Sequence, residues 1–184
     1  MDWLIVGLRN PGERYRGTRH NVGFEVASLA AERWDFGRPR RRYAGLYSEG
    51  RAGPGGPPAA VLLPTTYMNE AGRSVGPARG ALRLELDRVV VVHDEIDLPF
   101  GVVKSRLGGG LAGHNGLKSV RRELGSPDFR RVRVGVGRPD STDPEIVSAY
   151  VLGRFSEPSG EVRALVDRAA DELERVVVSA GRAV

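Results

Sequence analysis

The stretch RVVVVHDEIDLPFGVVKSRLGGGLAGHNG, residues 88–116, decides the fold of this chain. It opens with Val89–Val92, an unbroken β-branched run that is too short for a helix and is typical of a strand buried on both faces in a parallel sheet. A second strand is predicted over residues 101–107, and a glycine cluster then leads to a helix start near 114–115. Because open α/β sheets bind ligands beyond the carboxyl ends of their strands, we expect a functional site in this stretch.

Strands and helices alternate on both sides of this stretch. Short apolar runs predict further strands over residues 3–8, 44–50, 59–63 and 129–136. Apolar residues at helical spacing predict helices over residues 21–34, 67–82, 117–124 and 159–184. Asn21 is expected to cap the first helix. The pattern predicts one layered α/β domain over residues 1–184.

The arginines are expected on the surface. In the strand over 129–136 the alternation puts valines on one side and Arg131 and Arg133 on the other, so the strand should be half-buried. Four arginines within residues 38–42 are expected in a basic connection between elements. The formal net charge is +5 at pH 7, which favours a polyanionic partner.

The composition excludes several classes of protein. The chain has no cysteine, so disulfides, thiolate nucleophiles and cysteine metal sites are excluded. The start MDWLIVGL lacks the features of a signal peptide, and no stretch approaches the roughly 18 apolar residues of a membrane span. We therefore expect a cytoplasmic protein that does not bind a membrane.

Two cofactor sites are possible interpretations of the central stretch. Residues 108–113 match GxGxxG between a strand and a helix, as a dinucleotide-binding loop requires, but the match is weak, the segment lies in mid-chain, and a mobile loop explains it better. His93 and Asp94, with His20 and His114, offer ligands for a metal. Adjacent residues on a strand point to opposite faces, however, and no helical HxxxH pair is present. We therefore expect no cofactor and no metal.

The remaining candidates are one histidine, one carboxylate and several amides. No GxSxG motif is present, so a serine hydrolase of the common kind is not expected. His20, taken alone, is explained as a structural residue at a helix start, and asparagines are commonly turn or cap residues. Asn10, Asn69 and Asn115 nevertheless all fall at predicted strand ends or helix starts, where the loops of an α/β sheet can converge.

The chain resembles the bacterial peptidyl-tRNA hydrolases in five blocks of sequence. These blocks are VGLRNPGERYRGTRHNVGF, PTTYMNEAGRSV, VVVVHDEIDLPFGVVKSRLGGGLAGHNGLKSV, FRRVRVGVGRP and YVLGRF. They follow the family's order over most of the chain and are far more specific together than singly. The resemblance implies a single-domain α/β enzyme with a twisted mixed β-sheet and helices packed on both faces. It also implies hydrolysis of the ester that joins a stalled peptide to the 3′ ribose of tRNA.

The resemblance implies a role for each candidate. His20 is the base that activates water, and Asp94 is the partner that supports it. Asn10 reads the substrate, whereas Asn69 and Asn115 hold it at the scissile end. An ester hydrolase needs an activated water and a stabilised oxyanion, and a neutral imidazole with neutral amide donors can supply both.

Two tyrosines match the family, and two leucines differ from it. The resemblance implies that Tyr15 and Tyr67 line the tRNA or peptide site. Leu63 stands where the family usually has lysine, and Leu111 stands where it often has histidine or a small residue. Neither departure touches the proposed chemistry, although both bear on loop contacts.

A basic surface beside the site should hold tRNA phosphates. Lys104, Arg106 and Arg133 are the candidates because they lie on the predicted strands beside the glycine loop, and residues 38–42 are the alternative. We expect a monomeric, metal-independent hydrolase that binds peptidyl-tRNA. The alternative functions are RNA binding by the same fold without hydrolysis and a nucleotide-dependent oxidoreductase that uses the glycine loop.

Overall fold

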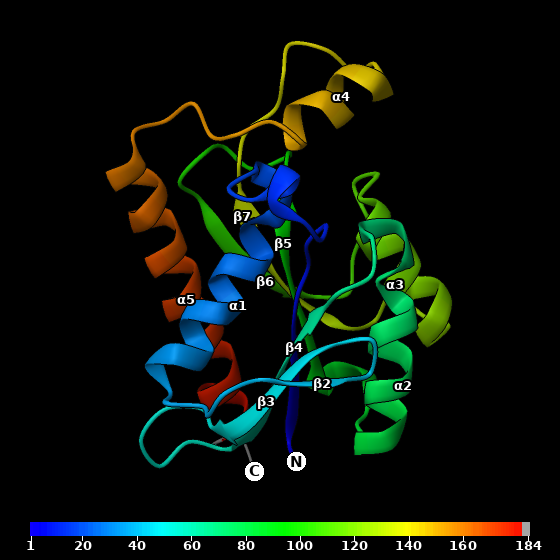
Figure 1. Cartoon of the computed structure of the whole chain (residues 1–184), viewed down its shortest axis with the longest axis vertical. Coiled ribbons are helices and arrows are strands. Elements are labelled where there is room, and N and C mark those ends of the chain that lie inside the picture. Colours follow the sequence, from blue (N-terminus) through cyan, green and yellow to red (C-terminus); the bar gives the residue numbers. More distant parts are fainter. Residues whose placement is uncertain (182–184) are drawn as a thin grey trace.

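The structure, a computed structural model, describes residues 1–181, and these form a seven-stranded mixed sheet flanked by helices (Figure 1). The strand order is β2-β3-β4-β1-β5-β7-β6. The strands are β1 (Trp3–Gly7), β2 (Arg40–Arg42), β3 (Gly45–Arg51), β4 (Pro58–Pro64), β5 (Val89–Glu95), β6 (Val103–Leu107) and β7 (Arg130–Gly135). The central strands β4, β1, β5 and β7 are parallel, whereas the β2–β3, β3–β4 and β6–β7 pairs are antiparallel.

The helices cover both faces of the sheet, as predicted. Helices α1 (Val22–Arg33) and α5 (Ser159–Gly181) lie on one face, and α2 (Gly72–Leu82) and α3 (Asn115–Leu124) lie on the other (Figure 1). Helix α4 (Pro144–Val151) lies beyond the carboxyl ends of the central strands. No helix within residues 1–181 combines the length and the apolar character that crossing a membrane requires.

The two central strands are buried on both faces. Every residue of β1 and β5 is buried. Val90 packs into the apolar layer under α1 and α5, and Val91 packs into the layer under α2 and α3. Such burial of alternate side chains on opposite faces is the reason that the valine run could be assigned to a central parallel strand.

Helix α2 forms although it contains Pro77 and several glycines. Gly72 lies against α3, where a Cβ atom would stand only 2.3 Å from the backbone oxygen of Ser119. The Gly72 N–H donates to the Ser119 hydroxyl at 2.9 Å. The glycine therefore allows two helices to pack closely and does not mark a break.

The structure differs from the sequence-based expectations in three places. Residues 40–42 form the edge strand β2, because pairing with β3 satisfies a backbone that was expected to be a connection. Helix α4 was not predicted, although Asp143 caps it by accepting from the Glu145 N–H at 2.9 Å and a proline follows the cap. Strand β5 continues to Glu95. The last predicted helix is present as α5 up to Gly181, and its predicted continuation over residues 182–184 lies outside the described part of the chain.

Candidate active site

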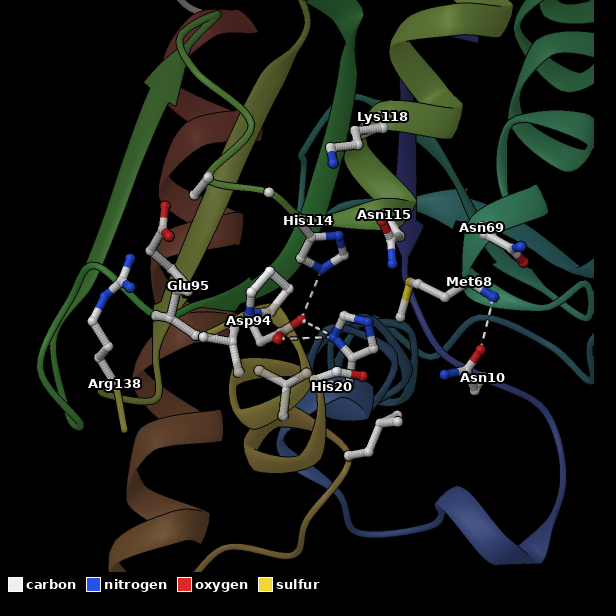
Figure 2. Close-up of a pocket in the computed structure, with 18 of the residues that line it drawn as sticks. Asn10, His20, Met68, Asn69, Asp94, Glu95, His114, Asn115, Lys118 and Arg138 are labelled. Carbon is white, nitrogen blue, oxygen red and sulfur yellow. Dashed lines mark hydrogen bonds and ion pairs between the residues drawn. The ribbon is translucent and has the colours of Figure 1, made fainter. Parts of the chain in front are cut away.

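A cavity of about 710 Å³ opens at the carboxyl ends of β1 and β5 (Figure 2). Its walls come from the short 3₁₀ turns η2 (Arg19–Asn21) and η3 (Met68–Glu70), the end of β5, the start of α3 and one side of α4. This is the edge at which a functional site was expected, and segments far apart in the sequence converge there.

Close packing of α1 on β5 brings the predicted base to its carboxylate. Gly23 lies against β5, where a Cβ atom would stand 2.1 Å from the backbone oxygen of Val92. The turn η2 precedes α1 and carries His20, which reaches Asp94 although the two residues are 74 positions apart. A methyl group at residue 23 would therefore push the two catalytic candidates apart.

Asp94 accepts hydrogen bonds from two imidazoles (Figure 2). The Nδ1 atom of His20 lies 3.0 and 2.9 Å from the two carboxylate oxygens, and the Nε2 atom of His114 lies 2.8 Å from Oδ1. All three side chains are buried. The ring proton of His20 is therefore on Nδ1, which donates to the carboxylate, and the Nε2 atom of His20 keeps a lone pair that faces the cavity.

His114 also caps helix α3, and this decides its tautomer. Its Nδ1 atom accepts from the N–H groups of Gly116 and Leu117 at 3.1 and 3.2 Å. A nitrogen that faces two donors must carry a lone pair, so the ring proton is on Nε2 and is donated to Asp94. His114 is thus a fixed donor and cannot act as the base.

The same tautomer argues against a metal at this cluster. His20, Asp94 and His114 offer ligand atoms within 4.8 Å of one another. A histidine that ligates a metal through Nε2 normally donates from Nδ1 to a partner in the protein. The Nδ1 atom of His114 faces two N–H donors. If the neutral ring bound a metal through Nε2, its proton would be on Nδ1 and would have no acceptor.

The charges of the cluster shift its pKa values in opposite directions. Burial disfavours the protonated His20 ring, but the charge and hydrogen bond of Asp94 outweigh burial and raise the pKa of His20. Burial also disfavours the charged Asp94, but His20 and His114 together hold the pKa of this carboxyl well below its usual range. Asp94 is therefore ionised throughout the physiological pH range, and its charge favours protonation of His20.

Asn10 is held with its amide nitrogen toward the cavity (Figure 2). Its Oδ1 atom accepts from the Met68 N–H at 2.8 Å. Its backbone is fixed by Asn21, whose side chain accepts from the Asn10 N–H at 2.8 Å and donates to the Asn10 carbonyl at 3.0 Å. Asn21 therefore occupies the cap position of α1 without capping it, because its amide is used to hold Asn10.

The other predicted site residues divide into two groups. Tyr67, Asn69 and Asn115 line the cavity, with the Asn115 amide directed into it and the Asn69 amide directed away in Figure 2. Residues of the second group do not line it: they are Tyr15, Lys104, Arg106 and Arg133. Lys104 and Arg106 are exposed on the edge strand β6, whereas Arg133 is largely buried and donates to Glu95 at 3.0 Å.

The third histidine does not take part in the cavity. His93 is 2% exposed, and its Nδ1 atom donates to the backbone oxygen of Asp94 at 2.8 Å. Burial and the neighbouring His114 lower the pKa of His93 to about 3, so the ring is neutral. It is a structural residue beside the site.

Sequence reasoning missed several residues of the cavity. His114 was considered only as a metal ligand, and its contact with Asp94 depends on the conformation of the glycine loop. The apolar side of α4, with Val147, Val151 and Leu152, was missed with the helix itself. The signal of α4 was present in the sequence as an aspartate followed by a proline at a helix start.

The glycine loop does not form a dinucleotide site. A pyrophosphate needs free N–H groups at the start of the following helix, and in α3 these groups are bonded to the His114 ring. The preceding strand, β6, is an antiparallel edge strand and not part of a parallel βα unit.

Comparisons with known proteins agree on one family. The sequence profile described as peptidyl-tRNA hydrolase matches residues 4–183. The peptidyl-tRNA hydrolase of Parvibaculum lavamentivorans is 48% identical over 91% of this chain and 80% of its own length, and that of Geobacillus kaustophilus is 43% identical over 95% and 92%. The crystal structure of peptidyl-tRNA hydrolase from Acinetobacter baumannii matches with a TM-score of 0.85 and 36% identity over 97% of this chain and 89% of that chain.

Proposed function

The chain belongs to the peptidyl-tRNA hydrolase family, and from this premise we propose how its residues hydrolyse the ester between a peptide and tRNA. The observation that carries the proposal is the contact between His20 and Asp94 at 2.9 Å in the wall of a cavity large enough for a ligand. Relatives named as hydrolases favour the enzyme over an RNA-binding protein without activity.

His20 acts as the general base. Its Nδ1 proton is donated to Asp94, so its Nε2 lone pair can accept a proton from a water in the cavity. The water oxygen attacks the ester carbonyl, and the proton then passes from Nε2 to the 3′ oxygen of the ribose as the ester bond breaks. Asp94 stabilises the imidazolium formed between these steps, and His114 holds Asp94 in place.

The oxyanion is stabilised by neutral amides. The amide of Asn115 is directed into the cavity, and its nitrogen can donate to the developing negative charge. Because Asn115 is the first residue of α3, the partial positive charge at the start of this helix acts in the same direction.

Asn10 distinguishes a blocked peptide from a free amino acid. Its oxygen is occupied by the Met68 N–H, so it offers only N–H donors to the substrate. A donor can bind the carbonyl of a peptide amide, but it repels the ammonium group of an ordinary aminoacyl-tRNA. The hydrogen bond from Met68 to Oδ1 therefore leaves only Nδ2 of Asn10 for the substrate, and Nδ2 selects a substrate that offers an acceptor.

One comparison tests this function. We would measure release of tRNA from N-acetyl-aminoacyl-tRNA and from the same aminoacyl-tRNA with a free amine, each with and without a chelator. We expect much faster cleavage of the blocked substrate and no effect of the chelator, because the proposed base needs no metal. Equal rates for the two substrates would contradict the role of Asn10, and loss of activity with chelator would contradict the metal-independent mechanism.

A further inference from the structure

Two buried arginines hold two of the segments that line the cavity, helix α4 and the glycine loop, whose Ala112 and Gly113 lie in its wall. Among residues 1–181, Arg19 and Arg131 are the buried arginines, with 7% and 1% of their surface exposed. Neither forms an ion pair with a carboxylate of the described residues. Burying a guanidinium without a carboxylate is costly, so each residue needs an explanation.

Arg19 binds the end of α4. Its guanidinium donates to the backbone oxygen of Tyr150 at 2.9 Å and to the Ser156 hydroxyl at 3.4 Å, and it stacks on the Tyr150 ring at 3.9 Å. Its backbone N–H donates to the Gly153 oxygen at 3.0 Å. Arg19 is also the neighbour of His20 in η2. One residue therefore joins the turn that carries the base to the helix that forms a wall of the cavity.

Arg131 binds the glycine loop in a comparable way. Its guanidinium donates to the backbone oxygens of Gly110 and of Pro127, the second at 2.9 Å, and stacks on Phe129 at 4.6 Å. Burial lowers the pKa of Arg131 to about 10, which leaves it charged at neutral pH. The sequence pattern put Arg131 on the solvent side of β7, and the structure corrects this because the loop covers it.

The two walls differ in chemistry. The side of α4 that faces the cavity is mainly apolar: Val147 and Val151, with Leu152 just after the helix, line it beside Ser148, which suits the side chains of a peptide. The glycine loop connects β6, which bears the exposed Lys104 and Arg106, to His114 and Asn115. Its surroundings are basic and suit the phosphates of RNA.

We propose that Arg19 and Arg131 are positioning residues that act on opposite sides of the scissile ester, Arg19 by holding α4 against the peptide and Arg131 by holding the glycine loop against the tRNA. This inference rests on the proposed function. Neither arginine touches the reacting atoms, and each acts through a backbone carbonyl of the wall that it holds.

Lysine variants with three substrates test the proposal. Lysine keeps the charge but lacks the planar fork that reaches two acceptors while stacking. The substrates are N-acetyl-phenylalanyl-tRNA, N-acetyl-glycyl-tRNA and the N-acetyl-phenylalanyl ester of adenosine. Arg19→Lys should raise KM for the phenylalanyl-tRNA about tenfold more than it raises KM for the glycyl-tRNA. Arg131→Lys should raise KM for the phenylalanyl-tRNA about tenfold. The same variant should change KM for the adenosine ester by less than about twofold.

The matched control is Arg130→Lys. Arg130 also donates to a backbone carbonyl, that of Asp87 at 2.9 Å, but this carbonyl does not border the cavity. Equal KM changes for all three substrates, or changes no larger than those of Arg130→Lys, would overturn the proposal, because displacing one wall should affect only the substrate part that the wall holds. A general loss of folded enzyme would lower the apparent kcat and leave KM unchanged.

Amide hydrogen exchange of the free proteins gives a second test without substrate. Arg19→Lys should speed exchange in residues 144–151, and Arg131→Lys should speed it in residues 108–113, each without affecting the other segment. Unchanged exchange in both segments would overturn the proposal. If the variants show these local changes in exchange but the parent enzyme fails to cleave blocked aminoacyl-tRNA, the proposed function is contradicted and the anchoring roles stand.

Discussion

Asp94 and Glu95 are adjacent, both buried, and held by different partners. Asp94 faces two imidazoles, whereas Glu95 accepts from the Arg133 guanidinium at 3.0 Å and from the Asp97 N–H at 3.3 Å. An imidazole can give up its proton near neutral pH, but a guanidinium cannot. The end of β5 therefore combines a site that can move a proton with an ion pair whose charges are fixed.

The largest effect is expected at Asp94. Asp94→Ala should lower kcat by about 10²–10⁴-fold, because His20 loses its orientation and its imidazolium loses a counter-charge. Asp94 raises the pKa of His20 and burial lowers it, so removing the carboxylate should move the acid limb of kcat/KM to lower pH. Profiles of kcat/KM against pH check this. A slow variant with the parent's acid limb would show that Asp94 is not coupled to the titrating base, and His20→Ala should abolish the limb.

A smaller effect is expected at His114. Asparagine at this position can still cap α3 but donates no imidazole proton to Asp94, so His114→Asn separates the two roles of this residue. We expect kcat to fall by about tenfold, the cost of one hydrogen bond to a charged group. With one donor fewer, Asp94 should stabilise the His20 imidazolium more, so the acid limb should move to higher pH, opposite to Asp94→Ala. A shift to lower pH would contradict the assigned tautomer.

The basic edge should affect binding and not the chemical step. Lys104→Ala and Arg106→Ala should each reduce the slope of log Kd for tRNA against log salt by about 0.7 to 0.9, because each removes one exposed phosphate contact. Arg133→Ala should reduce it less, since Glu95 already neutralises this arginine. Binding measured over a range of salt concentrations gives the slopes. The control is Arg41→Ala on β2 at the opposite edge, and a larger effect there would move the tRNA surface to residues 38–42.

The smallest effect is expected at Glu95. Glu95→Gln leaves the Arg133 guanidinium without its counter-charge and available to phosphate, so the salt slope for tRNA should steepen by less than about one unit. The acid limb of kcat/KM should stay where the parent has it, because Glu95 does not bond to His20. A shifted acid limb would contradict this separation, because it would show that Glu95 as well as Asp94 affects the pKa of His20.

The central part of the fold could be predicted because its strands β1 and β5 are buried on both faces along their whole length. The valine run of β5 is typical of a parallel strand, and loops at the ends of such strands can converge, so a site with the three asparagines was expected there. The pairing of His20 with Asp94 was expected only from the family resemblance. The edges were harder. Strand β2 consists of three arginines and is a strand only because β3 supplies hydrogen bonds that no local pattern indicates.

Contacts made through backbone carbonyls could not be predicted from residue types. Arg131 occupies a position that alternation assigns to solvent, and only the fold of the glycine loop over β7 explains its burial. The bond from His114 to Asp94 likewise depends on the start of α3, whose N–H groups select the ring tautomer.

The site draws on segments from Asn10 to Leu152. During synthesis, a chain that has emerged only as far as β5 already contains His20 and Asp94, but it lacks His114, Asn115 and the α4 wall. The complete site can form only after α4 has left the ribosome. For most of the time that this chain is itself a peptidyl-tRNA, it therefore has no complete site with which to cleave its own ester or those of neighbouring nascent chains.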